Sequence, residues 1–235
     1  GNRIPQLNFE VFRKAQPTGY VQEDPANMIR SVCLIPGTGE YALATTPVSY
    51  PFGFGASTSA NVNTNRGQAN VVHALDDLDD DLTDCGAVSL VVTWFGTDLR
   101  CGSCKIRPQV EQKAFDGAPM PWVVSGINRA GAVEGSRKDD RPVFGGTPAD
   151  ASVLEGIAAL RAQNKAVTFY PFILMDIQSG NGLIDPYTGN AEQPAIPWRG
   201  RITSSLAPNV TGTTDTTAAV AIEVDQFFGN AVVTD

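Results

Sequence analysis

The residue types that could do chemistry follow the two most apolar runs of the sequence. "AVSLVVTWF" (87–95) leads into Asp98 and Arg100, and "AVTFYPFILMDI" (166–177) contains Asp176. Hydrolysis of a glycosidic bond usually needs two carboxylates that flank the bond, one of them a general acid with a raised pKa. Asp98 and Asp176 are weak candidates for such a catalytic pair, which requires that the two runs be neighbouring strands. The favoured alternative is that each aspartate caps a helix or fixes a turn.

The long segment after residue 177 adds aromatic rings and guanidinium groups, in "DPYTGNAEQPAIPWRGR" (185–201). Aromatic rings stack on sugar faces, and charged groups hydrogen-bond to sugar hydroxyls. If the protein binds a carbohydrate, the predicted substrate-binding residues are Trp94, Arg100, Tyr187, Trp198 and Arg199. The alternative interpretation is that these residues order long loops through packing and salt bridges.

Cys101 and Cys104 have the spacing of half a zinc site. The second half is absent, and the single histidine, His73, is placed in a predicted helix. The pair therefore predicts structural thiols or a local disulfide, and we expect no metal and no cofactor. Six aspartates between residues 76 and 84 lack the glycine and the terminal glutamate of a calcium loop, which favours a solvated helix face. Serine-based catalysis has no support, because the chain contains no Gly-x-Ser-x-Gly motif.

The composition argues against nucleic-acid binding and against a membrane-spanning helix. The formal net charge is -8, with no basic stripe, so the sequence argues against nucleic-acid binding, which needs clustered Lys and Arg. No stretch approaches the ~20 apolar residues that a membrane-spanning helix requires. The four cysteines are too few for a disulfide scaffold of this size, so a reducing compartment is the simpler expectation.

Hydrophobic periodicity predicts an α/β fold. Buried strands alternate with amphipathic helices, an order typical of a parallel sheet. The helix after Gly146 is expected to have Thr147 as its cap and Pro148 in its first turn. Segments 37–68 and 97–146 read as long irregular stretches, the second with at most one short strand. The predicted regular elements are helices at 70–84, 147–165 and 213–230 and buried strands at 87–95 and 166–177.

Several long blocks of the sequence resemble a known family, the large tail-tip proteins of alphaproteobacterial gene transfer agents and related siphophages. Those proteins are baseplate hubs with an inserted glycoside-hydrolase-like TIM barrel. The resemblance covers nearly the whole chain. The blocks that carry it are "GNRIPQLNFEVFR", "MIRSVCLIPGTGEYALATTPV", "SLVVTWFGTDLRCGSCKIRPQVE", "FGGTPADASVLEGIAALRAQNKAVTFYPFILMDI" and "QPAIPWRGRIT".

This resemblance implies an α/β partial TIM-barrel-like domain preceded by a short β segment. Residues 1–36 would be the end of a β-type hub domain, 37–68 a linker or junction, and 69–235 the N-terminal part of the barrel. The sequence would then be an internal fragment of a longer chain, with the barrel and its acid/base glutamate continuing beyond Asp235. No catalytic residue of the family can therefore be carried over to this chain.

Three functions follow from these observations. The first is a structural component of a phage or gene-transfer-agent tail tip, involved in attachment to the host envelope or its penetration. The second is a glycoside hydrolase acting on peptidoglycan or surface polysaccharide, and the third is a non-catalytic glycan-binding module. The expected partners are other tail-tip and baseplate proteins, further copies of the chain, and a cell-wall or surface glycan. The expected location is the virion tail tip, after assembly in the bacterial cytoplasm.

Overall fold

The fold is known from a computed structural model, which describes residues 25–36, 39–197 and 201–229. Two of the predicted glycan contacts, Trp198 and Arg199, lie outside the described residues. A short helix, α1 (Pro25–Met28), opens the described part of the chain.

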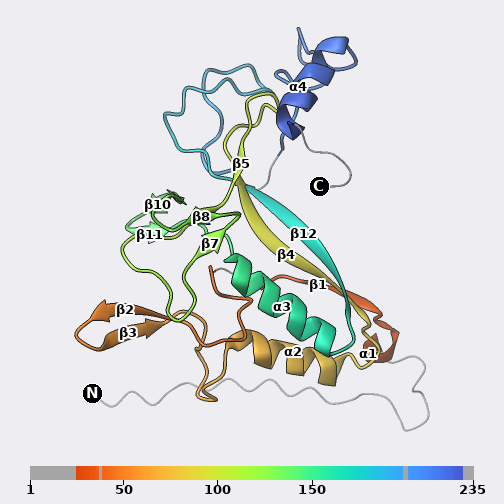
Figure 1. Cartoon of the computed structure of the whole chain (residues 1–235). Helices are drawn as coiled ribbons and strands as arrows, with labels where there is room; N and C mark the ends of the chain where they lie inside the picture. Colours follow the sequence, from red (N-terminus) through yellow and green to blue (C-terminus); the bar gives the residue numbers. More distant parts are fainter. Residues whose placement is uncertain (1–24, 37–38, 198–200, 230–235) are drawn as a thin grey trace, which may run out of the picture.

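A sheet forms the centre of the molecule, with three parallel strands in the order β1, β4, β12 (Figure 1). A two-residue strand, β5 (Ile106–Arg107), pairs antiparallel with the end of β4. β12 pairs with β4 along its whole length, from Ala166 opposite Ala87 to Met175 opposite Gly96. The predicted mixed α/β fold with a parallel sheet is therefore confirmed, and the two apolar runs are neighbouring strands. The strand bounds are β1 (Ser31–Leu34), β4 (Ala87–Gly96) and β12 (Ala166–Met175).

Two helices, α2 (Asn70–Asp81) and α3 (Asp150–Ala162), lie along the same side of this sheet (Figure 1). They bury one apolar cluster against alternate residues of the central strand, as the period of two in a strand requires. The members of that cluster include Val71, Leu75, Val88, Leu90, Val92, Val153 and Leu160. The aspartates of α2 face solvent, as expected.

The helix α3 begins later than the sequence predicts. Its N-cap is Ala149, and Asp150 is the acidic residue of its first turn. Thr147 is instead completely buried, and its Oγ1 accepts a hydrogen bond from the Gln109 N–H at 3.2 Å. The predicted cap at Thr147 and the predicted first-turn position of Pro148 are thus wrong, because a neighbouring segment takes the hydroxyl that a cap would use.

The strand β12 is much less buried than its apolar sequence predicts. Phe169 and Tyr170 each leave nearly half of their surface exposed, and only Leu174 and Met175 are buried. Within the described residues, β12 pairs only with β4. A continuous apolar run predicts burial on both faces, but burial also requires a layer on each side, and the described residues cover this strand only in part.

The segments expected to be irregular contain a second hydrophobic core. In segment 37–68, β2 (Ser49–Gly53) and β3 (Ala56–Ser59) form an antiparallel hairpin. Segment 97–146 holds seven two-residue strands, and "WVVSGI" is a small hairpin rather than one strand. Those strands are β5 (Ile106–Arg107), β6 (Gln109–Val110), β7 (Val123–Val124), β8 (Ile127–Asn128), β9 (Val133–Glu134), β10 (Arg137–Lys138) and β11 (Arg141–Pro142). The core joining both segments includes Tyr41, Ala44, Val48, Val110 and Trp122.

The last helix, α4 (Ala218–Phe228), has no buried residue. The apolar face expected from Val220, Val224 and Phe227 is only partly covered, with Phe227 packed against a small cluster that includes Cys104 and Met175. In the described part of the chain, no helix has the length and apolarity that crossing a bilayer demands.

Candidate functional site

The carboxylate of Asp98 lies just beyond β4 and is fully engaged. Its Oδ1 accepts hydrogen bonds from the Arg100 backbone N–H at 2.8 Å and from the Gln193 side chain at 2.8 Å. The guanidinium of Arg100 donates to both carboxylate oxygens, from Nε at 3.0 Å and from Nη2 at 2.7 Å. With Asp98 only 4% exposed, this group holds a loop in place and offers no free oxygen to a substrate.

The electrostatics of Asp98 are those of an anchored anion. Burial raises its pKa, but the hydrogen bonds from Arg100 and Gln193 lower it more, so the pKa lies below its usual value. A general acid in glycoside hydrolysis needs the opposite shift. Asp98 therefore stays ionised at neutral pH and suits a structural role.

Gln193 is the partner that sequence reasoning missed. Its side chain is almost completely buried and contacts two segments, because it accepts from the Leu99 N–H and donates to Asp98 and to the Ile184 carbonyl. The loop that follows β4, residues 97–105, is called the strand-end loop. It is also held by Thr203, whose carbonyl accepts a hydrogen bond from the Cys101 N–H at 2.7 Å. The motif "DLRCGSC" thus anchors the long loop that follows β12.

Asp176 is placed at the end of β12, beside the end of β4, through a hydrogen bond from its N–H to the Gly96 carbonyl. Its carboxylate accepts from the backbone N–H of Ser136 at 3.1 Å and also from the Ser136 hydroxyl. Gln178 donates to that same hydroxyl. Asp98 and Asp176 thus follow adjacent strands, yet each is bound to a different set of loop residues.

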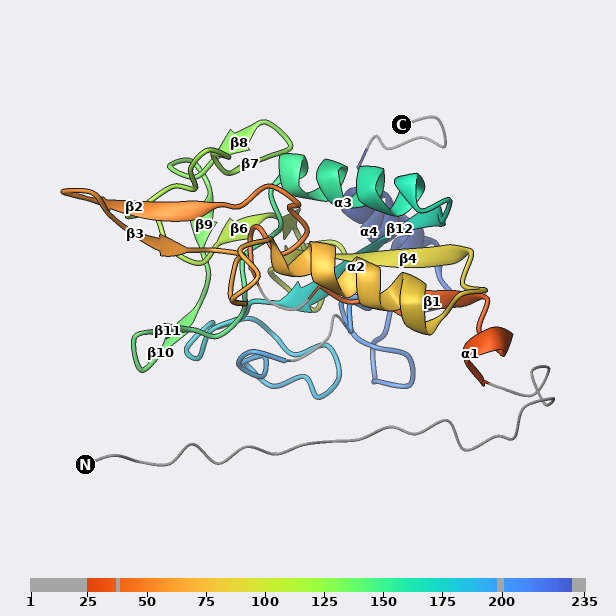
Figure 2. The same ribbon diagram turned by 90° about the horizontal axis from the view of Figure 1, so that it is seen from below.

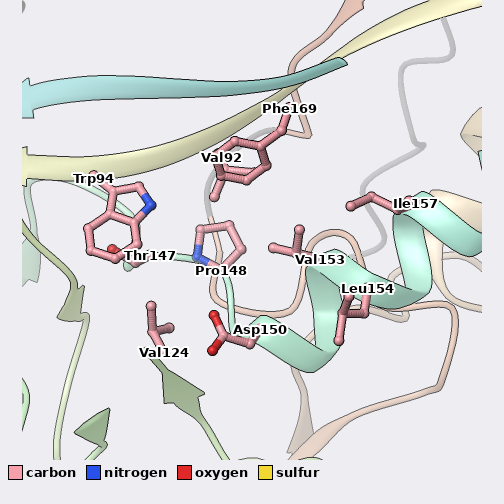
Figure 3. A pocket seen from close by; sticks show the side chains of 10 residues that line it. All are labelled: Val92, Trp94, Val124, Thr147, Pro148, Asp150, Val153, Leu154, Ile157 and Phe169. Atoms are coloured by element: carbon pink, nitrogen blue, oxygen red, sulfur yellow. The ribbon is translucent and has the colours of Figure 1, made fainter. Parts of the chain in front are cut away.

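Trp94 lies in a different environment from the two aspartates. It lines a pocket of about 400 Å³ between β4, β12 and the start of α3, facing Thr147 and Pro148 (Figure 3). The ring also packs against both hydrophobic cores. Tyr187 is 40% exposed, and its hydroxyl donates to the Arg201 carbonyl at 2.6 Å, within the long loop. The candidate glycan contacts are thus dispersed: Arg100 is paired with Asp98, Trp94 packs between cores, and Tyr187 closes a loop.

The opposite face of the sheet carries an apolar cavity of about 450 Å³. Its walls come from β4 and β12 on one side and from the segment before α3 on the other. Among the described residues that line it, none is ionisable, so any acid or base would have to come from a residue behind its walls. The lining residues are Ile35, Pro36, Val91, Thr93, Val143, Phe144, Gly145, Gly146, Pro148, Phe172, Leu174 and Ile196.

A second polar cluster, in the core near Tyr41, has no counterpart in the sequence analysis. Arg129 and Glu40 form a buried ion pair, and Asp116 pairs with the same guanidinium at 2.8 Å. Glu111 lies beside them, and burial together with the charge of Glu40 raises its pKa. The Gly146 N–H, on the wall of the apolar cavity, donates to Glu111 at 3.3 Å. Glu111 is therefore the carboxyl whose pKa shift has the direction that a general acid needs.

The cysteines are four free thiols, two of them in the strand-end loop. Cys101 and Cys104 are buried, and burial is the largest cause of the raised pKa of each thiol. A raised pKa keeps a thiol protonated and unreactive. Of the two alternatives from the sequence, the structural thiol pair is the one observed. His73 is buried on α2, with its Nδ1 3.4 Å from Nη1 of Arg66.

Glu223 attaches α4 to the segment that precedes it and, through Cys101, to the loop after β4. Its Oε2 accepts from the Ser205 N–H at 2.7 Å and from the Cys101 thiol at 3.6 Å. Its Oε1 accepts from the hydroxyls of Ser205 and Thr214 at 2.8 and 2.9 Å. One side chain thus supplies most of the polar contacts of a helix that has no buried residue.

We expect Glu223→Ala to release α4 without unfolding the sheet. Loss of four accepted hydrogen bonds should increase amide hydrogen exchange in residues 218–228 about tenfold, at little cost to global stability. Hydrogen exchange followed by mass spectrometry measures this, with Asp225→Ala on the same helix as the control. Unchanged exchange in the Glu223 variant would show that Phe227 alone holds the helix.

We expect Asp98→Asn to destabilise the protein by about 1.5–3 kcal/mol at neutral pH, because charge-assisted hydrogen bonds are lost. The folded-state pKa of Asp98 is lowered, so its contribution is present above the unfolded value of about 4 and is lost as pH falls through the folded value. Urea unfolding at pH 7 and at about pH 3 measures both. Asp80→Asn, at an exposed position of α2, is the control. An equal difference between wild type and Asp98→Asn at the two pH values contradicts the assignment.

Comparison with known proteins adds no family to this description: no family model matches the sequence, and neither does any curated protein.

Proposed function

We propose that this chain is a structural component of a phage or gene-transfer-agent tail tip, part of the baseplate hub that attaches to or penetrates the host envelope. The sequence resemblance described above supports the family. The observation that favours scaffold over enzyme is the state of the two strand-end carboxylates. Asp98 and Asp176 are both occupied by loop-ordering hydrogen bonds, and the pKa of Asp98 is shifted away from that of an acid catalyst.

The finer fold proposal is a partial TIM barrel. In such a barrel, consecutive parallel strands are neighbours and the helices between them all lie on the outer face. The order β1, β4, β12, with α2 and α3 on the same side, supports this proposal (Figure 1). The exposed aromatic residues of β12 are surfaces that the remaining strands and helices of a barrel would cover.

The proposed division of the chain into hub, junction and barrel changes at one strand, β1. β1 pairs in parallel with β4, Ser31 opposite Ala87 and Leu34 opposite Leu90. We therefore assign residues 31–34 to the barrel as its first strand, rather than to the hub segment that ends at residue 36. The partners of the assembled protein would be other tail-tip and baseplate proteins and further copies of this chain, in the virion.

Deletion of the coding segment from its source genome tests the tail-tip proposal. The proposal predicts particles that lack a normal tail tip or fail to deliver DNA, and rescue by the intact gene. Particles with normal tails and normal delivery would exclude a structural role.

A glycoside hydrolase is the second candidate, and the raised pKa of Glu111 next to the cavity wall is the observation that favours it. It predicts release of reducing sugar from purified cell wall, lost in Glu111→Gln. Binding of cell-wall fragments without release would point instead to the third candidate, a glycan-binding module.

A further inference from the structure

The hairpin of β2 and β3 projects from the body of the molecule, as two perpendicular views show (Figures 1 and 2). We call residues 49–59 the aromatic hairpin. Its base is fixed to the body by a bridge between Ser49 and Ala118, with both backbone hydrogen bonds formed at 2.8–2.9 Å. Its side is supported by an edge-to-face contact between Phe52 and Phe115, with ring centroids 4.8 Å apart. The hairpin is therefore a positioned projection rather than a loose loop.

The tip of the aromatic hairpin presents an aromatic ring to solvent at a backbone cost. Gly53 pairs with Ala56, so Phe54 and Gly55 form a two-residue turn with φ of 51° and 79°. Positive φ at both positions is what a type I′ turn requires, and the first position favours Asn, Asp or Gly. A bulky residue at positive φ is strained. Phe54 adopts this strained conformation although its side chain is completely exposed, at 112% of the reference area.

The segment around the tip carries no charge. Residues 41–65 contain no Asp, Glu, Lys or Arg, in a chain that is 18% charged with a net charge of -8. The exposed Ile222 and Phe228 of α4 differ in this respect, because they lie on the same helix as Glu223 and Asp225. A charge is costly inside a bilayer. β12 also lacks charged residues, but its exposed Phe169 and Tyr170 lie on a strand of the central sheet and not on a projection.

We propose that the aromatic hairpin inserts its tip, Phe54 with Phe52 behind it, into the interface of an electrically neutral lipid bilayer. A bilayer needs no matching pocket and penalises charges and unpaired backbone groups. The hairpin offers neither charge nor a long unpaired stretch, since its strands pair with each other up to a two-residue turn, interrupted only by a register shift between Pro51 and Gly53. Burial of exposed aromatic surface supplies the driving force. This inference stands independently of the tail-tip proposal, because it rests on the shape, exposure and charge of the hairpin and not on the family resemblance.

Co-sedimentation of the full chain with vesicles tests the proposal. We expect binding to vesicles of phosphatidylcholine, and weaker binding at low salt when phosphatidylglycerol is added, because the chain and that surface are both negative. Phe54→Ala should weaken partitioning about tenfold to a hundredfold, the fold-change expected from losing the burial of one aromatic side chain. Phe228→Ala, a matched change at another exposed phenylalanine, should leave partitioning unchanged.

Phe54→Asn separates stability from binding. Asn suits the first position of a type I′ turn, so this variant should keep or raise Tm while losing as much binding as Phe54→Ala. The proposal is overturned if the wild type stays in the supernatant with both lipid mixtures, or if Phe54→Asn binds like the wild type. It is also overturned if binding requires phosphatidylglycerol, or if Phe54 drives self-association without lipid, which would make the contact one with protein.

Discussion

Replacement of Arg129 by Met is expected to lower the free energy of unfolding by about 3–5 kcal/mol, the cost of breaking a buried ion pair from one side. Arg129 is 4% exposed, and its partner Glu40 is 1% exposed. Removing the guanidinium leaves the Glu40 carboxylate buried in a cluster that also contains the Tyr41 and Tyr50 hydroxyls. Thermal or urea unfolding measures the loss.

The size of this effect follows from the number of hydrogen bonds that the Arg129 guanidinium donates. A guanidinium has five N–H donors, and all five have partners. Nε donates to Asp116 at 2.8 Å, Nη1 donates to Glu40 and to the Gln112 carbonyl, and Nη2 donates to Glu40 and to the Tyr41 hydroxyl. A network satisfied in this way binds nothing further, so its role is to fix the second core.

Two further variants distinguish the ion pair from simple packing. Arg141→Met, at an exposed position, should change stability by less than about 0.5 kcal/mol. Glu40→Gln combined with Arg129→Met removes both charges and should recover part of the loss. A single Arg129→Met variant as stable as Arg141→Met would contradict the assignment.

Replacement of Trp122 by Ala is expected to cost about 3–5 kcal/mol, the range for removal of a large aromatic side chain from a core. Among the described residues, Trp122 is the largest side chain that is completely buried, and its Nε1–H donates to the Thr147 carbonyl at 2.8 Å. Its ring lies in the core built from segments 37–68 and 97–146. Urea unfolding of the variant measures the loss.

Trp122→Phe is the matched control for the hydrogen bond. It retains most of the ring and loses the indole donor, so the cost should be smaller, about 1–3 kcal/mol for one buried carbonyl left without its partner. If Trp122→Ala costs less than about 1 kcal/mol, segment 97–146 contributes little to the folded state. That result would restore the interpretation of the segment as irregular.

The sheet and its helices were predictable because their signals are local. The strand at 87–95, the helix at 70–84 and the neighbouring strand at 166–177 follow from side-chain periodicity within each segment. The exposure of β12 was not predictable in the same way. An apolar run indicates that a strand is suited to burial, but whether it is buried depends on residues elsewhere in the fold that pack against it.

The second core was missed because its contacts join distant residues of unremarkable type. Asn61 is buried and holds three neighbours, accepting from the Val48 N–H and donating to the carbonyls of Ala44 and Thr46, in a segment rich in Gly, Ser and Thr. Glu40 and Arg129 are 89 positions apart. Neither lies in a motif, and such a pairing depends on the fold that brings them together.

The candidate site was predictable in its position but not in its role. Asp98 and Asp176 do end neighbouring strands, as the catalytic-pair hypothesis requires. Their hydrogen bonds decide what they do, and those come from Gln193 and Ser136, which carry no sequence signal. The same spacing of residue types is compatible with an active site and with two loop anchors.

Immunogold electron microscopy of particles from the source organism tests the tail-tip proposal most directly. Antibodies raised against this chain should label one end of the particle, at the tip of the tail and not at the capsid. Label on the capsid, or label found only in particle-free cell fractions that release sugar from cell wall, would contradict the proposal and favour the hydrolase.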